Sequence, residues 1–345
     1  MQIKMPAKAM RLGQRYAMLS IITASLFLFT KLITTGTPQS QTIRRDVIAD
    51  KPPTRVFLWA VPRSVSTTLL ISLSQSPDVE AWFEPYLFAS QMEHFRLSGE
   101  SVSLQWGLKM TLASLSVTHG YDMRDVSFTW VKQQLENYNG DKNVIVKDMV
   151  KGIAGKFNNI PNGYTHTFLI RHPLRVFASY KQKHNTEGGM NKGLKLTEFS
   201  SCWIPSGYFF KEMYDLVHHI RDVLKLKVII IDSDDLLENP EEMIKAYCKE
   251  TGLTYSDTML NWEPNNDIWW NWMLPKETSL KWWWRSVYYG YNPTHKTSFS
   301  QSGFGEKMDL PDHVDDDVRE LAQASMKYYN ELFTQRLQVA SYESH

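Results

Sequence analysis

Residues 61–68 combine one cation with several hydroxyls in a way that suits the binding of an anion. The segment reads Val-Pro-Arg-Ser-Val-Ser-Thr-Thr and joins an apolar run, residues 55–60, to a stretch with helical spacing. The first N–H groups of a helix are unpaired, and the helix dipole favours negative charge there. Arg63 and the hydroxyls of Thr67 and Thr68 would complete a phosphate cradle. Taken alone, the segment is also compatible with an ordinary, well-capped helix, because the glycines and the lysine of the nucleoside-triphosphate loop are missing.

A second segment, residues 168–179, has the same layout. An apolar run ends at Arg171, and the helical stretch that follows carries Ser179, eight residues after Arg171. Arginine supplies a forked, permanently charged donor and serine a short hydroxyl, so both side chains could reach one phosphate. By itself, Arg171 fits a surface ion pair equally well.

The elements that must position these segments alternate between strand and helix. Apolar, β-branched runs predict buried strands at 55–60, 79–82, 143–147, 166–170 and 227–231. Helices are predicted at about 67–75, 103–118, 128–138, 174–183 and 206–225. Another is marked by Asn239 as its cap, Pro240 in its first turn and Gly252 at its end. The alternation predicts an α/β fold: a three-layer α/β/α, P-loop-like domain with a central parallel sheet.

Composition narrows the class of protein. The chain has 345 residues, of which 43% are hydrophobic and 22% charged, as in ordinary globular proteins. A net charge of +1 gives no electrostatic support for a nucleic-acid partner. The two cysteines, Cys202 and Cys248, lack metal-ligand spacing, and no metal site is predicted. A bridge between them and two free thiols are both compatible with the sequence.

Together, the segments resemble the sulfotransferase superfamily from about residue 55 to 253, and more weakly to about 310. Residues 62–69 are similar to the family's 5′-phosphosulfate loop, Arg171 and Ser179 to its 3′-phosphate pair, and residues 231–240 to the strand and helix that follow. The resemblance implies 3′-phosphoadenosine 5′-phosphosulfate as co-substrate, no metal, and an acceptor hydroxyl on a sugar, a protein or a small molecule. It implies that the donor's 5′ end contacts Arg63, Ser64, Val65, Ser66, Thr67 and Thr68.

The tyrosylprotein sulfotransferases give the best local parallel and imply the catalytic residues. Glu84 follows a Ser-Pro-Asp-Val stretch and lies 21 residues after Arg63, while Lys147 opens a Lys-Asp pair at the end of a strand. By this likeness, Glu84 takes the acceptor's proton, and Lys147 and Arg63 stabilise charge as the sulfuryl group moves. The residue types also fit a helix-capping or salt-bridging acid at Glu84 and a structural ion pair at Lys147, near Asp148.

The chain departs from the family pattern in its phosphate loops. Val65 stands in place of a loop glycine, and we expect the loop to avoid a positive φ there, since a β-branched residue adopts one only at high cost. Arg63 stands where the cytosolic enzymes have lysine. Residues 301–305 take the place of a basic, glycine-containing loop but have no cation, so Ser302 or the Gly303 amide is expected to serve, or the donor binds more weakly.

The N-terminus differs from the rest of the chain. Residues 1–45 contain no acidic residue, and four cations precede an uncharged run at 16–30. This pattern predicts a signal anchor within residues 1–33, with its span at 16–33 and a cytoplasmic N-terminus; a cleaved signal peptide and an organellar transit peptide are the alternatives. A stem at 34–53, the sulfotransferase domain at 54–335 and a tail at 336–345 follow. We expect a single-pass type II protein of the Golgi or another secretory membrane, with mitochondrial or cytoplasmic location as alternatives.

Two other functions compete with sulfuryl transfer. A nucleotide-dependent phosphotransferase could use the same cradle, but would need Mg²⁺ ligands and a loop lysine. A catalytically degenerate sulfotransferase fold could act as a binding module. The presence of Glu84, Arg63 and Lys147 together favours an enzyme.

Overall fold

The structure is a computed structural model that describes residues 52–98, 119–185, 191–201, 203–262, 272–276 and 314–339. Several predictions fall outside these residues: the anchor at 16–33, the helix at 103–118, Cys202, Ser302 and Gly303. Among the described helices, none is long and apolar enough to cross a membrane. The predicted anchor therefore stays a prediction.

Five parallel strands form the sheet, in the order β2-β3-β1-β4-β5. They are β1 (Arg55–Ala60), β2 (Val79–Phe83), β3 (Asn143–Met149), β4 (Thr165–Ile170) and β5 (Val228–Asp232), each within one or two residues of the predicted bounds. The central strand β1 is wholly buried from Val56 to Ala60. Because both faces of this strand are covered, neither face is exposed to water, and all of its side chains can be apolar.

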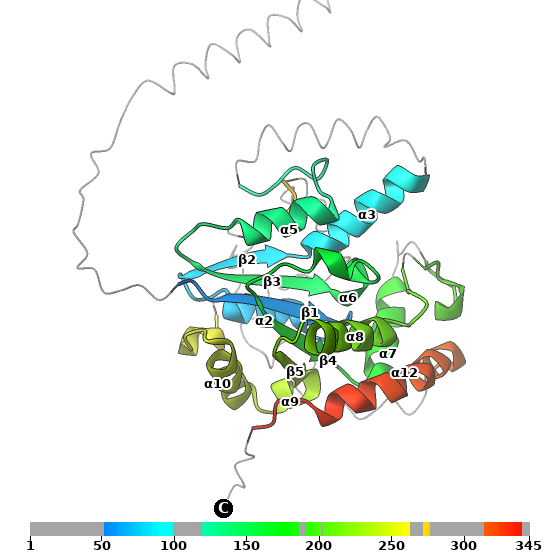
Figure 1. Cartoon of the computed structure of the whole chain (residues 1–345). Helices are drawn as coiled ribbons and strands as arrows, with labels where there is room; N and C mark the ends of the chain where they lie inside the picture. Colours follow the sequence, from blue (N-terminus) through cyan, green and yellow to red (C-terminus); the bar gives the residue numbers. More distant parts are fainter. Residues whose placement is uncertain are drawn as a thin grey trace, which may run out of the picture. The chain divides into compact units, whose positions relative to one another are not determined.

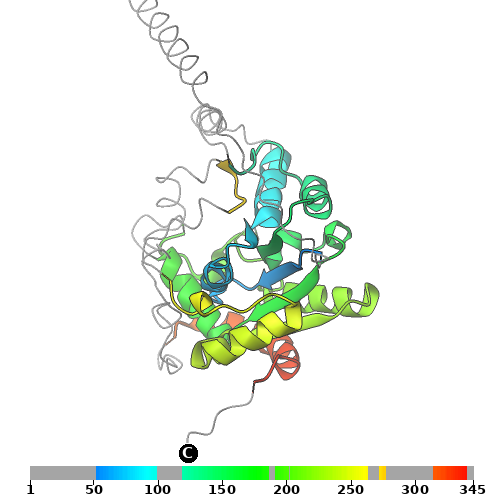
Figure 2. The same cartoon turned by 90° about the vertical axis from the view of Figure 1, so that its left-hand side faces the viewer.

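Helices cover both faces of the sheet (Figures 1 and 2), so the predicted α/β/α architecture is confirmed. The helices are α2 (Ser66–Leu73), α3 (Pro85–Ser98), α5 (Phe128–Glu136), α6 (Val150–Ile153), α7 (Pro173–His184), α8 (Phe210–His218), α9 (Ser233–Glu238), α10 (Pro240–Thr251) and α12 (Asp316–Thr334). Short turns of helix lie at η1 (Phe157–Asn159), η2 (Leu196–Glu198) and η4 (Asp257–Met259), and a π-helical turn, η3 (His219–Val223), continues α8.

Neighbouring residues of β4 show how the two faces differ. Thr167 contacts the hydroxyl of Tyr247 on α10 at 3.0 Å. The preceding residue, His166, lies on the opposite face, where Trp59 donates to its Nδ1 at 3.2 Å. Trp59 also stacks on Phe57 there, at 3.8 Å between ring centroids. One face is therefore closed by α10 and the other by an aromatic layer.

Helix boundaries show where local signals were sufficient. Gly252 ends α10 with φ 82°, as predicted for a left-handed cap. Asn239 does precede α10, but its side chain makes no capping hydrogen bond, so that part of the prediction is wrong. The helix α3 was not predicted; it follows β2 after a single residue, Glu84, and starts with Pro85.

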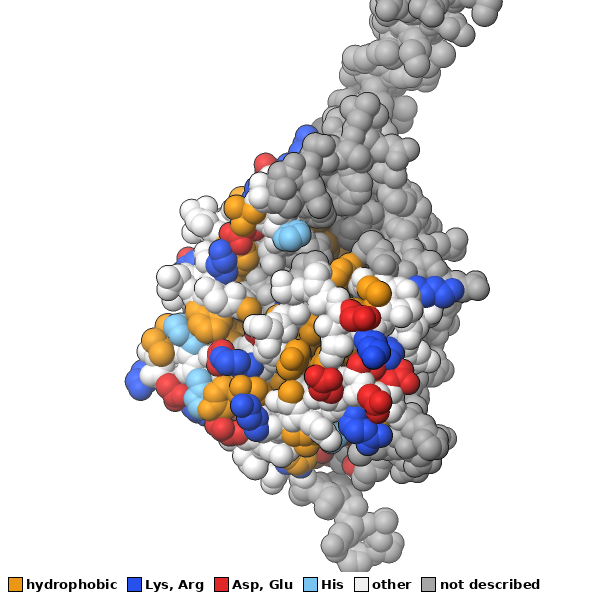
Figure 3. Space-filling view, turned by 90° about the vertical axis from the view of Figure 1, so that its right-hand side faces the viewer, with side chains coloured by type: hydrophobic (Ala, Val, Ile, Leu, Met, Phe, Trp, Pro, Cys, Tyr) orange, Lys and Arg blue, Asp and Glu red, His pale blue; other side chains and the backbone are white. Residues whose placement is uncertain are grey.

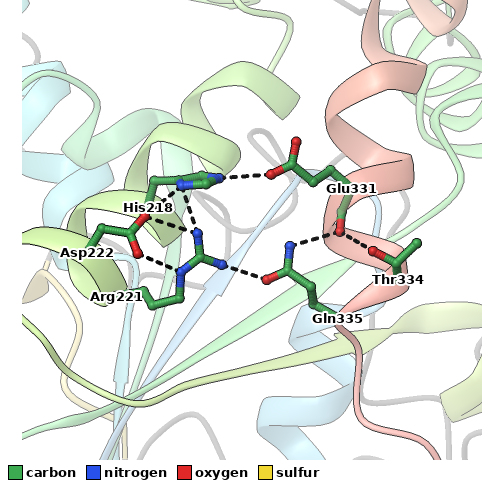
Figure 4. A network of polar contacts seen from close by, with 6 residues as sticks. All are labelled: His218, Arg221, Asp222, Glu331, Thr334 and Gln335. Atoms are coloured by element: carbon green, nitrogen blue, oxygen red, sulfur yellow. Dashed lines mark hydrogen bonds and ion pairs between the residues drawn. The ribbon is translucent and has the colours of Figure 1, made fainter.

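A polar network fastens α12 to the end of α8 and to η3 (Figure 4). His218 lies between two carboxylates, 2.8 Å from Asp222 and 3.1 Å from Glu331. Arg221 donates to the side chain of Gln335 at 2.6 Å. Because these groups are largely exposed, we assign them to the orientation of α12 and expect each pair to add little stability.

The face drawn in Figure 3 carries acidic and basic side chains interspersed with apolar ones. This mixture agrees with the net charge of +1 of the whole chain. No single sign of charge dominates that face.

His166 is fully buried, and burial lowers the pKa of its imidazole from 6.5 to about 4. Among the described residues its Nε2 has no hydrogen-bond partner, while Nδ1 accepts from Trp59. The ring is therefore neutral in the folded protein near pH 7. As the pH falls below 6.5, His166 binds a proton in the unfolded chain but not in the folded protein. The free energy of unfolding therefore decreases as the pH falls from 6.5 to about 4.

We expect His166→Asn to remove this loss. Asparagine can still accept from Trp59 but does not titrate, and other buried groups contribute equally to both proteins. Between pH 7 and pH 5 the wild type should lose about 2 kcal/mol more unfolding free energy than the variant. Urea denaturation at the two pH values measures the difference. The matched change at the exposed His119 should keep the wild-type slope, and the prediction fails if His166→Asn keeps it too.

Candidate active site

The two predicted anion-binding segments meet at the carboxyl edge of the sheet. The chain leaves β1 toward β2 and β3 on one side, whereas β4 and β5 lie on the other side of β1. In open α/β sheets, ligands bind where connections diverge in this way, beyond the carboxyl ends of the strands. The loop after β1 and the loop after β4 border that point.

Two side chains join these loops directly. Arg63 Nε donates to the hydroxyl of Ser179 on α7 at 2.9 Å. Arg171, at the end of β4, donates through Nη1 to the carbonyl of Arg63 at 2.9 Å. The sequence analysis placed Arg63 at the 5′ end of the donor, and Arg171 and Ser179 at its 3′-phosphate. In the structure Arg63 contacts both of these residues.

The loop after β1 does adopt the conformation that the sequence argued against. Val65 has φ 55° and ψ 16° and immediately precedes α2. Arg63 also has a positive φ, of 62°. The expectation that valine would exclude a positive φ here is therefore wrong. The side chain of Val65 is only 6% exposed and belongs to the hydrophobic core, so its burial offsets part of the backbone strain.

The hydroxyls of the loop divide into two groups. Ser64 is fully buried, and its hydroxyl donates to the carbonyl of Val61 at 2.7 Å, so it shapes the loop itself. Ser66 and Thr68 are also buried, within the first turn of α2, while Thr67 is half-buried. The amides at the start of α2 and the hydroxyl of Thr67 are the groups best placed to meet an anion.

The segment after β5 supports both loops, which the sequence did not predict. The hydroxyl of Ser233 lies 2.9 Å from the carbonyl of Ser64 and 2.7 Å from that of Ile170, and donates to both. Asp234 lies 3.7 Å from Arg171 Nε and 3.2 Å from Arg175 Nε. The only signal in the sequence was the likeness of residues 231–240 to the family, which names no role for these side chains.

Arg171 stands in a crowded, buried setting. Its side chain is almost wholly enclosed. Burial lowers the pKa of its guanidinium to about 10, and the charges of Arg175 and Arg63 act in the same direction, against Asp234 and Asp232. The group remains protonated at neutral pH, and an additional anion beside it would relieve the crowding of positive charge.

Glu84 and Lys147 form a buried ion pair at the ends of β2 and β3. Lys147 is 0% exposed and Glu84 2%, and the lysine ammonium donates to the glutamate carboxylate. The backbone N–H of Glu84 also donates to the carbonyl of Lys147 at 2.6 Å. The ammonium lies 4.7 Å from the ring centroid of Phe83. The partner of Lys147 is therefore Glu84, and both family-implied residues are in one place.

Asp148 does not pair with Lys147 but accepts hydrogen bonds from the backbone. Its carboxylate accepts from the backbone N–H of Tyr86 at 2.5 Å, of Leu87 at 3.1 Å and of Met149 at 2.8 Å. Burial, followed by the charge of Glu84, raises the pKa of this carboxyl. Asp148 thus fixes the first turn of α3, directly after Glu84, which itself has φ 53°. The sequence missed this role, although it noted the Lys-Asp pair.

Other predicted features lie partly or wholly beyond the described residues. Ser302 and Gly303 are outside them. Trp262 and Trp272 are buried, and Trp272 stacks on Phe83 at 5.6 Å, so these two pack in the core. Cys248 is a free, buried thiol. No group of three or more His, Cys, Asp or Glu side chains that could hold a metal ion occurs in the described part of the chain.

Comparison with known proteins places this site in a family. Two curated relatives from Arabidopsis thaliana are similar to this chain. Branched-chain-amino-acid aminotransferase-like protein 2 is 25% identical over 63% of this chain and 34% of the relative. Branched-chain-amino-acid aminotransferase-like protein 1 is 23% identical over 68% of this chain and 36% of the relative. The chain thus spans about a third of the length of each relative.

Among solved structures, the sulfotransferase domain of the Synechococcus PCC 7002 olefin synthase is 16% identical over 81% of this chain and 98% of its own, with a TM-score of 0.42. A sulfotransferase from Alicyclobacillus acidocaldarius is 13% identical over 84% and 98%, with a TM-score of 0.43.

A family model described as a sulfotransferase domain matches residues 54–192. This range contains the loop after β1, the Glu84–Lys147 pair, Arg171 and Ser179. This match confirms the resemblance found in the sequence: residues 54–192 are similar to sulfotransferase domains.

Proposed function

We propose that this chain transfers a sulfuryl group from 3′-phosphoadenosine 5′-phosphosulfate to the hydroxyl of an acceptor. The observation that carries the proposal is the contact of Arg63 with both Ser179 and Arg171, a short distance along the sheet edge from the buried Glu84–Lys147 pair. Two anion-binding loops and a potential base are thereby gathered at one edge of the sheet.

The proposed division of labour follows from the chemistry of each group. The amides at the start of α2 hold the 5′-phosphate, and Arg171 with Ser179 holds the 3′-phosphate. Glu84 accepts the proton of the acceptor hydroxyl as its oxygen bonds to sulfur. The bond between sulfur and the bridging oxygen breaks, and the nucleotide bisphosphate leaves. Lys147 and Arg63 neutralise the charge that builds on the leaving oxygen and the sulfuryl oxygens.

The ion pair suits Glu84 to this task. Lys147 keeps the carboxylate oriented, and the buried surroundings strengthen its interaction with the lysine. Asp148 holds the backbone that carries Glu84 and therefore acts as a positioning residue.

The donor prediction concerns Arg171. 3′,5′-Adenosine bisphosphate should stabilise the protein against heat more than ADP, which lacks the 3′-phosphate. Arg171→Ala should abolish the difference, since a charge-assisted contact contributes about 1.5–3 kcal/mol. Arg171→Lys, which keeps the charge but not the fork, should retain part of it. Equal stabilisation of the wild type by both nucleotides would rule out this 3′-phosphate site and favour a phosphotransferase or another nucleotide.

The base prediction concerns Glu84. Glu84→Gln keeps the size of the side chain and an oxygen for Lys147 but removes basicity. We expect turnover to fall by about 10²–10⁴-fold while the affinity for 3′,5′-adenosine bisphosphate stays within about twofold. Transfer of labelled sulfuryl groups to a panel of hydroxyl acceptors measures the first quantity and calorimetry the second. Wild-type turnover in the variant would assign the base elsewhere; no turnover in either protein, with nucleotide binding intact, would favour a binding module.

The positioning prediction concerns Asp148. Asp148→Asn leaves one oxygen to serve three N–H donors, so the first turn of α3 loosens and Glu84 loses its fixed position. We expect kcat to fall at least about tenfold, with the KM for the nucleotide unchanged, at a temperature well below the melting point. The same substitution at the exposed Asp141, outside this turn, serves as a control for expression and folding. An unchanged kcat in Asp148→Asn would show that α3 does not depend on this carboxylate.

A further inference from the structure

Two lysines that the proposed mechanism does not use lie on α7 and α6, the helices that follow β4 and β3. Lys183 lies in the last turn of α7, four residues after Ser179. Residues four apart lie on the same face of a helix. Because Ser179 accepts from Arg63, Lys183 lies on the face of α7 that borders the proposed active site.

The second lysine approaches from another element. Lys151 belongs to α6, which follows β3 and therefore lies just past Lys147. Its ammonium lies 5.9 Å from the ring centroid of Trp203. That ring meets His184 edge-on at 5.2 Å, and His184 is the neighbour of Lys183. The hydroxyl of Tyr180 fixes this arrangement by donating to the Trp203 carbonyl at 3.1 Å.

The charges of these cations act on one another. Burial and, after it, the charge of Arg63 lower the pKa of Lys183 to about 8, although Glu84 acts in the opposite direction. Lys147 and Lys151 also lower this pKa. The pKa of His184 falls to about 4 through burial and the charges of Lys183, Lys151 and Arg63. A bound anion would reverse these unfavourable interactions.

The donor nucleotide does not account for all of these charges. Its phosphates are served by the start of α2 and by Arg171 and Ser179, and its sulfuryl group by Arg63 and Lys147. Lys151 and Lys183 are half-buried on the helices that follow β3 and β4, and the charge of Glu84 acts on Lys183. In the proposed mechanism the acceptor hydroxyl must arrive at Glu84. Trp203 is half-buried too, and its ring offers Lys151 a flat apolar neighbour.

Resting on the proposed function, we propose that Lys151, Lys183 and Trp203 form an acceptor subsite for an oxyanion. The acceptor would then be a hydroxyl compound that carries a carboxylate or a sulfate close to the hydroxyl that is modified. The two lysines bind the oxyanion, and Trp203 packs against the adjoining carbon skeleton. Lys151 and Lys183 determine acceptor choice in this arrangement and leave donor binding to the other residues.

Binding of simple anions tests the subsite before any acceptor is identified. The full chain is saturated with 3′,5′-adenosine bisphosphate and titrated with sodium sulfate or sodium acetate, at ionic strength held constant with sodium chloride. Calorimetry or thermal shift gives the affinity. The same titrations are made on Lys151→Gln, on Lys183→Gln and on the control Lys245→Gln. Lys245 is a half-buried lysine of α10 that pairs with Glu241.

We expect saturable sulfate or acetate binding to the wild type and to the control, weakened about tenfold in each of the other two variants. The anion whose binding weakens in the two lysine variants identifies the oxyanion of the acceptor. Affinity for 3′,5′-adenosine bisphosphate should stay within about twofold in all proteins. No saturable binding of either anion to the wild type, or equal binding by both lysine variants and the wild type, would overturn the subsite.

The pH dependence of anion binding gives a second test, because Lys183 loses its proton as the pH rises through its pKa of about 8. Anion affinity of the wild type should fall between pH 7 and pH 9, and Lys183→Gln should show little of this fall. The charged groups that face Lys183 are Arg63, Glu84, Lys147, Lys151 and His184. Failure of the nucleotide itself to bind the wild type would contradict the proposed function, whereas anion binding, measured on the free protein, would still decide the subsite.

Discussion

The ion pair between Lys147 and Glu84 is the constraint on which the edge of the sheet depends. Removing each of the two charges from water costs several kcal/mol, so such a pair is stable only when the fold fixes its geometry. The pairing of β2 with β3 sets Phe83 opposite Lys147, and Glu84 is the next residue. Asp148 then accepts from the first amides of α3. The pair, the start of α3 and the positive φ of Glu84 are thus parts of one arrangement.

A second set of polar contacts ties the remaining strands to the same edge. Ser233 donates to carbonyls in the loop after β1 and at the end of β4. Asp232 accepts from the amide of Asp234 and from the hydroxyl of Tyr329 on α12. Burial raises the pKa of Asp232 to about 7, and the charges of Asp234 and Asp235 add to that effect. The segment after β5 therefore supports the loops after β1 and β4 and links them to the last described helix.

Of the six non-glycine residues with positive φ in the described part of the chain, three lie where the chemistry is proposed. Arg63, Val65 and Glu84 all have positive φ without being glycine. Each such residue costs about 1–3 kcal/mol, which the surrounding structure must offset. At Val65 the offset comes from a buried side chain, at Arg63 from the hydrogen bond to Ser179, and at Glu84 from the ion pair. A loop that lacks the family's glycine can hold its shape because tertiary contacts determine it.

The sequence by itself determined the strands, the parallel α/β class and the two strand–helix junctions at which we propose anion binding. Each of these depends on a local pattern: an apolar run for a strand such as β1, and an arginine or hydroxyl where a strand gives way to a helix. Only the tertiary structure decided that Glu84 is the partner of Lys147, that Arg63 contacts Ser179, and that Val65 adopts a positive φ. It also brought Ser233 to the loop after β1 and Lys151 to Trp203. The physical reason is that strand order and register set these distances, and residues more than sixty or a hundred positions apart in the chain leave no local pattern that records their contact.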